Sequence, residues 1–312
     1  MIGVTGYTGF VGKILLQQLD GSDVVLLGRC QLKGYKNFIQ FDLEKTGNLA
    51  DSYELKNIHT LIHTAARVHV MNDHSLDPLA HYRAINTTGT IALAKQAALS
   101  GVRRFIFLSS VKVNGESTTY RTPFSVFEKP EPQDPYGVSK LEAERELKAL
   151  GRASGMEIVI IRSPLIYGRG VKANFASLMR LVNRGLPLPV RALDQNKRSL
   201  VSVYNLVDLI KICIDHPKAA NQIFFASDDN DLSTAEIVAL MAKVQNKKNY
   251  SFPIPSCLFY LTGKLLNKGD VVDRLAGSLQ VDLTHTKSTL NWTPPYSVEH
   301  GFTLATHKPY DK

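Results

Sequence analysis

Residues 2–12 read Ile-Gly-Val-Thr-Gly-Tyr-Thr-Gly-Phe-Val-Gly, and this stretch decides the fold. Its first four residues predict a buried strand, and the residues from Phe10 to Leu19 predict a helix with its apolar side chains on one face. The glycine spacing between them allows a tight turn and a close approach to a pyrophosphate, and free N–H groups at a helix start bind negative charge. We therefore predict a dinucleotide site, with a merely structural turn as the alternative. The cofactor residues predicted in this glycine-rich loop are Gly6, Tyr7, Thr8, Gly9, Phe10, Val11 and Gly12.

The first half of the chain alternates β-branched apolar runs with amphipathic stretches, which predicts a parallel sheet with helical crossovers. We expect an α/β protein with a doubly wound parallel sheet over residues 1–163, to which strands near 199–226 return. Residues 164–312 should form mainly a smaller C-terminal lobe. The predicted strands are Ile2–Thr5, Val24–Leu27, Phe38–Phe41, Thr60–Thr64, Phe105–Ser109, Glu157–Ile161 and Ser199–Val203. The predicted helices are Phe10–Leu19, Pro78–Ser100, Tyr136–Leu150, Phe175–Arg184 and one that begins with a capping box at Ser233.

The charge balance of 37 basic and 28 acidic side chains gives +9, which favours an anionic partner. The cations are scattered and do not alternate with aromatic residues, so we expect no nucleic-acid partner. No apolar run has the length to cross a bilayer, and the chain opens directly on a strand. We therefore expect no membrane insertion and a cytoplasmic location. The spacings of Cys30, Cys213 and Cys257 suit neither a disulfide framework nor a metal site.

Tyr136 and Lys140 are four residues apart on a predicted helix, so both point to one face. A nearby ammonium and an oxidised nicotinamide both stabilise a phenolate, which then takes a proton from a hydroxyl or returns one to a carbonyl. Ser109 and Ser110 end an apolar strand at the edge of the sheet where ligands bind, and Ser110 is placed to orient the substrate oxygen. The alternative for Tyr136 and Lys140 is that they lie on a solvated helix surface. The alternative for the two serines is that they only cap a loop.

Residues at the ends of the second and third predicted strands are candidates for binding the adenosine half of the cofactor. In NAD-binding sheets an acidic residue follows the second strand, and here Arg29 takes that place, where an arginine can pair with the ribose phosphate of NADP. We therefore predict NAD or NADP, with a slight preference for NADP. Asp42 offers a carboxylate to the adenine amino group, or else caps the turn that follows.

Six features in order resemble the extended short-chain dehydrogenases/reductases. Within that superfamily the chain is similar to bacterial UDP-hexose 4-epimerases and UDP-4-keto-sugar reductases of the NAD-dependent epimerase/dehydratase family, a likeness that residues 65–71, 113–115 and 162–168 support. The features are the glycine triplet, Asp42-Leu43, His63-Thr64-Ala65-Ala66, Asn86 before Gly89-Thr90, Ser109-Ser110, and Tyr136 with Lys140.

The resemblance implies a Rossmann sheet that holds the dinucleotide and a C-terminal lobe that holds a UDP-sugar. It implies Ser110, Tyr136 and Lys140 as catalytic residues and a homodimer that pairs the helices Thr87–Leu99 and Tyr136–Leu150 of each subunit. Its further cofactor residues are Leu43, Ala65, Ala66, Arg67, Asn86, Ser109 and Ser163, and Tyr136 and Lys140 also border the cofactor. Its substrate residues are Ser110, Asn174, Arg198 and Arg274; Asn174 has the alternative of capping the following helix.

Departures from the family pattern narrow the reaction. Dehydratases carry an Asp-Glu pair where this chain has Val111-Lys112, so we expect no sugar dehydration. Two reactions remain: 4-epimerisation of a UDP-hexose of the UDP-glucose or UDP-N-acetylglucosamine type, and NADPH-dependent reduction of a UDP-4-keto-6-deoxy-hexose. A non-catalytic dinucleotide sensor is the third possibility. We predict no metal, because the spacings of His59, His63, His69, His74 and His81 match no metal motif.

Overall fold

The computed structural model describes residues 1–45, 55–68, 77–171, 173–255, 258 and 269–307. Seven parallel strands form the main sheet in the order β3-β2-β1-β4-β5-β6-β9, in which the direction of strand addition reverses between β1 and β4. A second sheet pairs β7 with β8. The strands are β1 (Ile2–Thr5), β2 (Val24–Gly28), β3 (Asn37–Gln40), β4 (Thr60–His63), β5 (Arg104–Ser110), β6 (Glu157–Ser163), β7 (Leu165–Tyr167), β8 (Leu200–Ser202) and β9 (Ile223–Phe225).

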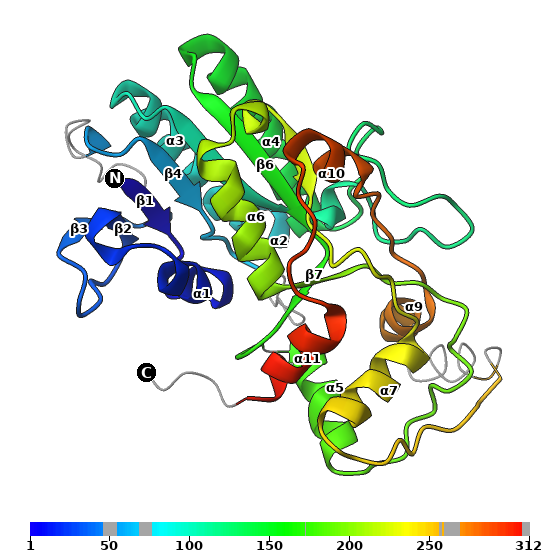
Figure 1. Ribbon diagram of the computed structural model, residues 1–312. Coiled ribbons are helices and arrows are strands. Elements are labelled where there is room, and N and C mark those ends of the chain that lie inside the picture. Colours follow the sequence, from blue (N-terminus) through cyan, green and yellow to red (C-terminus); the bar gives the residue numbers. More distant parts are fainter. Residues whose placement is uncertain (46–54, 69–76, 172, 256–257, 259–268, 308–312) are drawn as a thin grey trace.

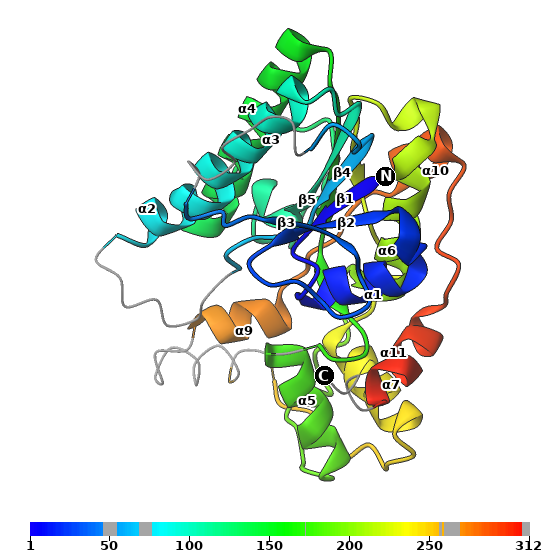
Figure 2. The ribbon, with the colours of Figure 1, turned by 90° about the vertical axis from the view of Figure 1, so that its left-hand side faces the viewer.

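Helices cover both faces of the main sheet, which confirms the predicted doubly wound fold. Figure 2 shows α1 (Phe10–Gln18) and α6 (Val203–Asp215) on one face, and α2 (Pro78–Tyr82), α3 (Thr90–Leu99) and α4 (Pro135–Ser154) on the other. One buried cluster joins Leu15 of α1 to Leu206 of α6, and a second joins Leu93 of α3 to Leu147 of α4. Both faces of the central strands are therefore apolar, as parallel sheets require.

Two of the predicted helices differ most from the structure. The predicted helix Pro78–Ser100 is interrupted by a π-helical turn, Arg83–Gly89, between α2 and α3. The helix α4 continues past Gly151. Glycine is needed there for close packing rather than to end the helix, because a Cβ at Gly151 would lie 2.6 Å from the Ile158 side chain. The helix ends at Ser154, and Gly155 supplies the left-handed residue after it.

The remaining helices lie mainly in a lobe beyond the carboxyl ends of the strands (Figure 1). A third buried cluster, which includes Phe175, Met241 and Phe302, holds α5, α7 and α11 together, and Ser233 and Glu236 form the expected capping box. Within residues 199–226, β8 pairs with β7, so only β9 extends the main sheet. The helices are α5 (Ala173–Asn183), α7 (Thr234–Val244), α9 (Gly269–Ala276), α10 (Thr284–Leu290) and α11 (Val298–Thr306), with short 3-10 turns at Gly21–Asp23, Val111–Val113 and Pro217–Ala219. Among the described residues, no helix is both long and apolar enough to cross a membrane.

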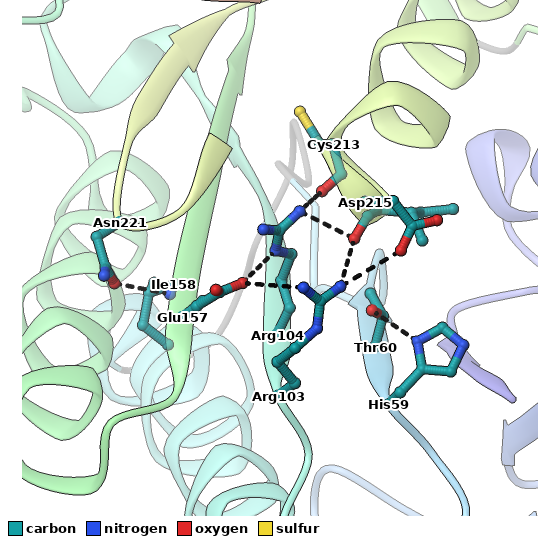
Figure 3. Close-up of polar contacts among 10 residues, drawn as sticks. His59, Thr60, Arg103, Arg104, Glu157, Ile158, Cys213, Asp215 and Asn221 are labelled. Carbon is teal, nitrogen blue, oxygen red and sulfur yellow. Dashed lines mark hydrogen bonds and ion pairs between the residues drawn. The ribbon is translucent and has the colours of Figure 1, made fainter. Parts of the chain in front are cut away.

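A charged cluster fastens α6 at the amino ends of the strands, opposite the lobe (Figure 3). The buried Arg104 side chain donates to the carbonyls of Cys213 and Ile214 at 2.7 and 2.9 Å and pairs with Glu157 at 2.7 Å. A guanidinium at a helix C-terminus satisfies its last carbonyls and is favoured by the helix dipole. This cluster fixes β5, and with it the strand end that carries Ser110.

Candidate active site

Gly6 and Gly12 of the glycine-rich loop are packed so closely that neither position has room for a side chain. The Gly9 N–H donates to the Gly6 carbonyl at 2.8 Å. Gly6 has φ +69°, and a Cβ there would lie 2.5 Å from the Ala65 nitrogen; a Cβ at Gly12 would lie 2.3 Å from the Gly6 oxygen. No described side chain caps α1, and its first turn carries no acidic residue. The N–H groups at this helix start therefore fit a dinucleotide pyrophosphate.

Tyr7 turns away from the loop surface. Its ring is buried, its hydroxyl donates to the Cys30 carbonyl, and a Cβ at Gly28 would lie 2.6 Å from that hydroxyl. Tyr7 thus ties the loop to the end of β2, and only its backbone can face a pyrophosphate. Arg29 lies between Gly28 and Cys30, the two residues that contact Tyr7, and is exposed to solvent.

The positions after β3 and β4 lie at the same edge of the parallel sheet as the glycine-rich loop. Asp42 accepts a hydrogen bond from the Glu44 N–H at 3.1 Å, which is the turn-capping alternative for this carboxylate. The buried amide of Asn86 pairs with both backbone groups of Arg67, at 2.9 and 3.0 Å, and donates to Ser139 at 3.1 Å. Asn86 therefore holds the segment from Ala65 to Arg67 in place from the π-helical turn.

Tyr136 lies in the first turn of α4, next to the carboxyl end of β5. The helix begins with Asp134 as N-cap, whose Oδ1 accepts from the Gly137 N–H at 2.6 Å. Burial raises the pKa of Tyr136 above its ordinary value, the charge of Asp134 raises it further, and a hydrogen bond with the Ser110 hydroxyl lowers it. The structure thus brings Ser110 and Tyr136 together across two elements.

Lys140 is one helical turn further and fully buried. Its Nζ donates to the Leu108 carbonyl at 2.9 Å and lies 4.3 Å from the centre of the Phe107 ring. Burial lowers the pKa of Lys140 to about 7, although the nearby charge of Glu144 raises this pKa and so opposes the shift. A lysine with that pKa changes charge near neutral pH, so small electrostatic changes control how well it stabilises a phenolate.

His63 is a buried neighbour of this site rather than a surface histidine. Its two ring nitrogens lie 2.7 Å from the Thr5 hydroxyl and 3.0 Å from the Thr90 hydroxyl. Burial, and then the charge of Lys140, lower its pKa to about 3, so it is neutral at physiological pH. Two of the predicted histidine group, His69 and His74, lie outside the described residues.

A buried ion pair between α4 and β6 was not predicted from the sequence. The Arg162 guanidinium donates to both carboxylate oxygens of Glu144, at 3.0 and 2.6 Å, and to Asn114 at 3.0 Å. The Ser109 hydroxyl donates to Glu144 at 2.6 Å, and that of Ser163 donates to the Ser109 carbonyl at 3.4 Å. An arginine within the apolar strand β6 is the signal that could have revealed this pair.

Of the four expected substrate residues, three lie after residue 164, and the structure brings two of these, Arg198 and Arg274, into one region. Arg198 donates to the Gly277 carbonyl at 3.1 Å, and burial lowers its pKa, as does the nearby charge of Arg274 on α9. Two neighbouring cations form a fitting site for a diphosphate. Asn174 is exposed in the first turn of α5, one residue inside the helix rather than at its cap.

Residues 2–225 match the model of the NAD dependent epimerase/dehydratase family. The chain belongs to this family. It is 51% identical over 304 residues, 96% of its length and 92% of the relative's, to a UDP-glucose 4-epimerase of Vibrio cholerae. It is 26% identical, over 95% of its length and 91% of the relative's, to N-acetyl-alpha-D-glucosaminyl-diphospho-ditrans,octacis-undecaprenol 4-epimerase of Escherichia coli O157:H7.

Among solved structures, the fold is similar to that of the Thermotoga maritima UDP-glucose 4-epimerase with UDP-glucose, with a TM-score of 0.78 and 22% identity over 97% of this chain and 96% of that one. The Bacillus cereus UDP-N-acetylglucosamine 4-epimerase gives a TM-score of 0.75 at 19% identity, again over 97% and 96%. The resemblance inferred from the six ordered features is therefore confirmed, and the epimerase/dehydratase chain is an enzyme.

Proposed function

We propose that this enzyme interconverts the two C4 epimers of a UDP-hexose of the UDP-glucose or UDP-N-acetylglucosamine type. The observation that carries the proposal is the placement of Ser110 at the carboxyl end of β5 beside the first turn of α4, which carries Tyr136, with Lys140 one turn further along the same helix. Such a pair moves a proton at a carbinol oxygen. The relative with 51% identity, which is named a UDP-glucose 4-epimerase, supports the same reaction.

In this reaction Tyr136 as phenolate takes the proton from the sugar O4, and the Ser110 hydroxyl orients that oxygen by a hydrogen bond. Charged Lys140 stabilises the phenolate. A nicotinamide cofactor, which the glycine-rich loop and residues 65–67 would hold, would supply a hydride acceptor for C4 and a hydride donor for the opposite face of the 4-keto sugar. Tyr136 then returns its proton to O4, so no net oxidation or reduction occurs.

We assign the dinucleotide to the carboxyl ends of β1 to β5. The glycine-rich loop would hold the pyrophosphate, Asp42, Leu43 and Arg29 the adenosine half, and residues 65–67 the remainder, with Ser163 close by. Residues 164–312 would mainly form the substrate lobe, where Arg198 and Arg274 take the diphosphate and Asn174 extends the site. A cytoplasmic location stays a prediction.

NAD is the cofactor that a reaction without net redox change favours, and the family description names it. The exposed Arg29 beyond β2 supports a second candidate, NADPH-dependent reduction of a UDP-4-keto-6-deoxy-hexose with Tyr136 as the acid. The two differ in one measurable way: epimerisation leaves the cofactor unchanged, and reduction consumes it.

The test incubates the purified enzyme with UDP-glucose or UDP-N-acetylglucosamine alone, and separately with a UDP-4-keto-6-deoxy-hexose plus NADPH. Sugars are followed by NMR and NADPH by absorbance. We expect C4 epimers without added cofactor, loss of turnover in Tyr136→Phe, and retained turnover in the remote control Tyr35→Phe. Stoichiometric loss of NADPH would support the reductase instead. Dinucleotide binding with neither activity would leave a sensor, and full turnover by Tyr136→Phe would overturn the catalytic assignment.

A further inference from the structure

Lys112 contacts both elements of the catalytic pair. It lies in the 3-10 turn Val111–Val113 directly after Ser110, and its backbone N–H donates to the Ser110 hydroxyl at 3.3 Å. Its ammonium donates to Asp134 Oδ2 at 2.6 Å and to the two carboxylate oxygens of Glu116 at 2.7 and 2.9 Å. The side chain is 27% exposed, so these ion pairs are partly shielded from water.

Asp134 is the residue through which Lys112 acts on the helix. One carboxylate oxygen caps α4 through the Gly137 N–H, and the other receives the Lys112 ammonium. A Cβ at Gly137 would lie 2.6 Å from the Lys112 carbonyl, so the first turn of α4 packs directly on the 3-10 turn. Tyr136 lies between Asp134 and Gly137, and its distance from Ser110 depends on this packing.

We propose that Lys112 is a positioning residue that holds the start of α4 against the strand end carrying Ser110 and neutralises the Asp134 carboxylate beside the Tyr136 phenol. The inference rests on the proposed function, because turnover is its principal readout. Burial lowers the pKa of Lys112, but hydrogen bonds with Asp134 and Glu116 raise it by more. Lys112 is therefore charged at neutral pH.

The groups around the phenol show why this neutralisation matters. Burial and the charge of Asp134 raise the pKa of Tyr136, as does Tyr82 from α2, and only the hydrogen bond with Ser110 lowers it among these causes. Lys140, one turn along α4, and His63 on β4, whose pKa the charge of Lys140 lowers, are further titratable groups of this region. Without Lys112, the Asp134 carboxylate beside the phenol would lose this ammonium, and a higher pH would be needed to ionise Tyr136.

The test compares Lys112→Met, Lys112→Arg, Asp134→Asn and the double variant Lys112→Met/Asp134→Asn. Asparagine caps helices as well as aspartate, so Asp134→Asn removes the charge and keeps the cap. The matched control is Lys243→Met, which breaks an exposed pair with Glu299 (2.7 Å) on α7 and α11.

We expect Lys112→Met to lower kcat at pH 7 by about tenfold, with the kcat–pH profile moved up by about one unit and KM changed by less than about twofold. Lys112→Arg should keep the wild-type profile, Asp134→Asn alone should move it to lower pH, and the double variant should regain most of the lost kcat. Lys243→Met should match wild type. An independent readout is the ultraviolet absorbance of the Tyr136 phenolate, taken as the difference from the same protein with Tyr136→Phe.

An unshifted pH profile in both Lys112→Met and Asp134→Asn overturns the inference, and so does a double variant no better than Lys112→Met. If Lys112→Met does not fold, Asp134→Asn and Lys112→Arg still decide the question. Failure of the proposed function has a different signature, namely no epimerisation by the wild-type enzyme. In that case the phenolate titration of Tyr136 alone tests the role of Lys112.

Discussion

The Glu144–Arg162 pair is the internal ionic contact whose loss should be most costly. Both side chains are only 2% exposed, and the carboxylate accepts two hydrogen bonds from Arg162 and one from Ser109. In Glu144→Gln, Arg162 keeps the acceptor at Asn114, but its charge has no carboxylate partner. Breaking a buried pair in this way destabilises a protein by about 3–5 kcal/mol, whereas replacing both partners by apolar residues is often close to neutral.

The magnitude can be judged against a total stability of about 5–15 kcal/mol for a typical domain. Glu144→Gln should therefore leave a folded protein with a clearly lower urea midpoint. The matched control is Glu299→Gln, which breaks the pair with Lys243, where the two side chains are 64% and 53% exposed. Exposed pairs contribute about 0–1 kcal/mol, so the control should stay near wild type.

Urea unfolding at pH 7, followed by circular dichroism, measures both variants and the double change Glu144→Leu/Arg162→Met. The double variant should be more stable than Glu144→Gln because it leaves no unpaired charge at the site of this ion pair. A Glu144→Gln variant within about 1 kcal/mol of wild type would refute the reasoning, since it would show that water or rearrangement solvates Arg162. A double variant as unstable as the single one would show instead that packing, not charge, sets the cost.

Three further predictions concern the cofactor loop, Lys140 and assembly. Gly12→Ala places a Cβ 2.3 Å from the Gly6 oxygen and should weaken dinucleotide binding by more than about tenfold in calorimetry, whereas Gly269→Ala, with nothing within 4 Å, should bind normally. Burial lowers the pKa of Lys140 to about 7 from its ordinary value of 10.5, so below pH 7 the buried positive charge of Lys140 opposes folding. Between pH 7 and 10.5 the folded protein loses this proton before the unfolded chain does, and the opposition to folding decreases. The stability of cofactor-free wild type should thus rise relative to Lys140→Met by up to about 1.4 kcal/mol per pH unit above pH 7, and parallel curves in urea would contradict this. Sedimentation should find a homodimer paired through α3 and α4, and a monomer at micromolar concentration would exclude it.

The sequence alone determined the parallel sheet and predicted the residues of the candidate site. Strands β1 to β6 were predicted to within two residues at each end, because their apolar runs are short and bounded by turn residues. The glycine spacing and the Tyr136–Lys140 spacing each lie within one loop or one helix. Such local patterns are set by backbone geometry, so the residues that share a face can be read without the rest of the fold.

Only the tertiary structure decided how these residues are held. Tyr7 with Cys30, Asn86 with Arg67, Lys112 with Asp134 and Glu144 with Arg162 join residues 18 to 23 positions apart, on different elements. No spacing rule predicts such pairs, because they depend on how each connecting segment returns the chain to the sheet. The sequence therefore predicted the groups proposed to act on the substrate, and the packing of the elements decided which other charges surround them.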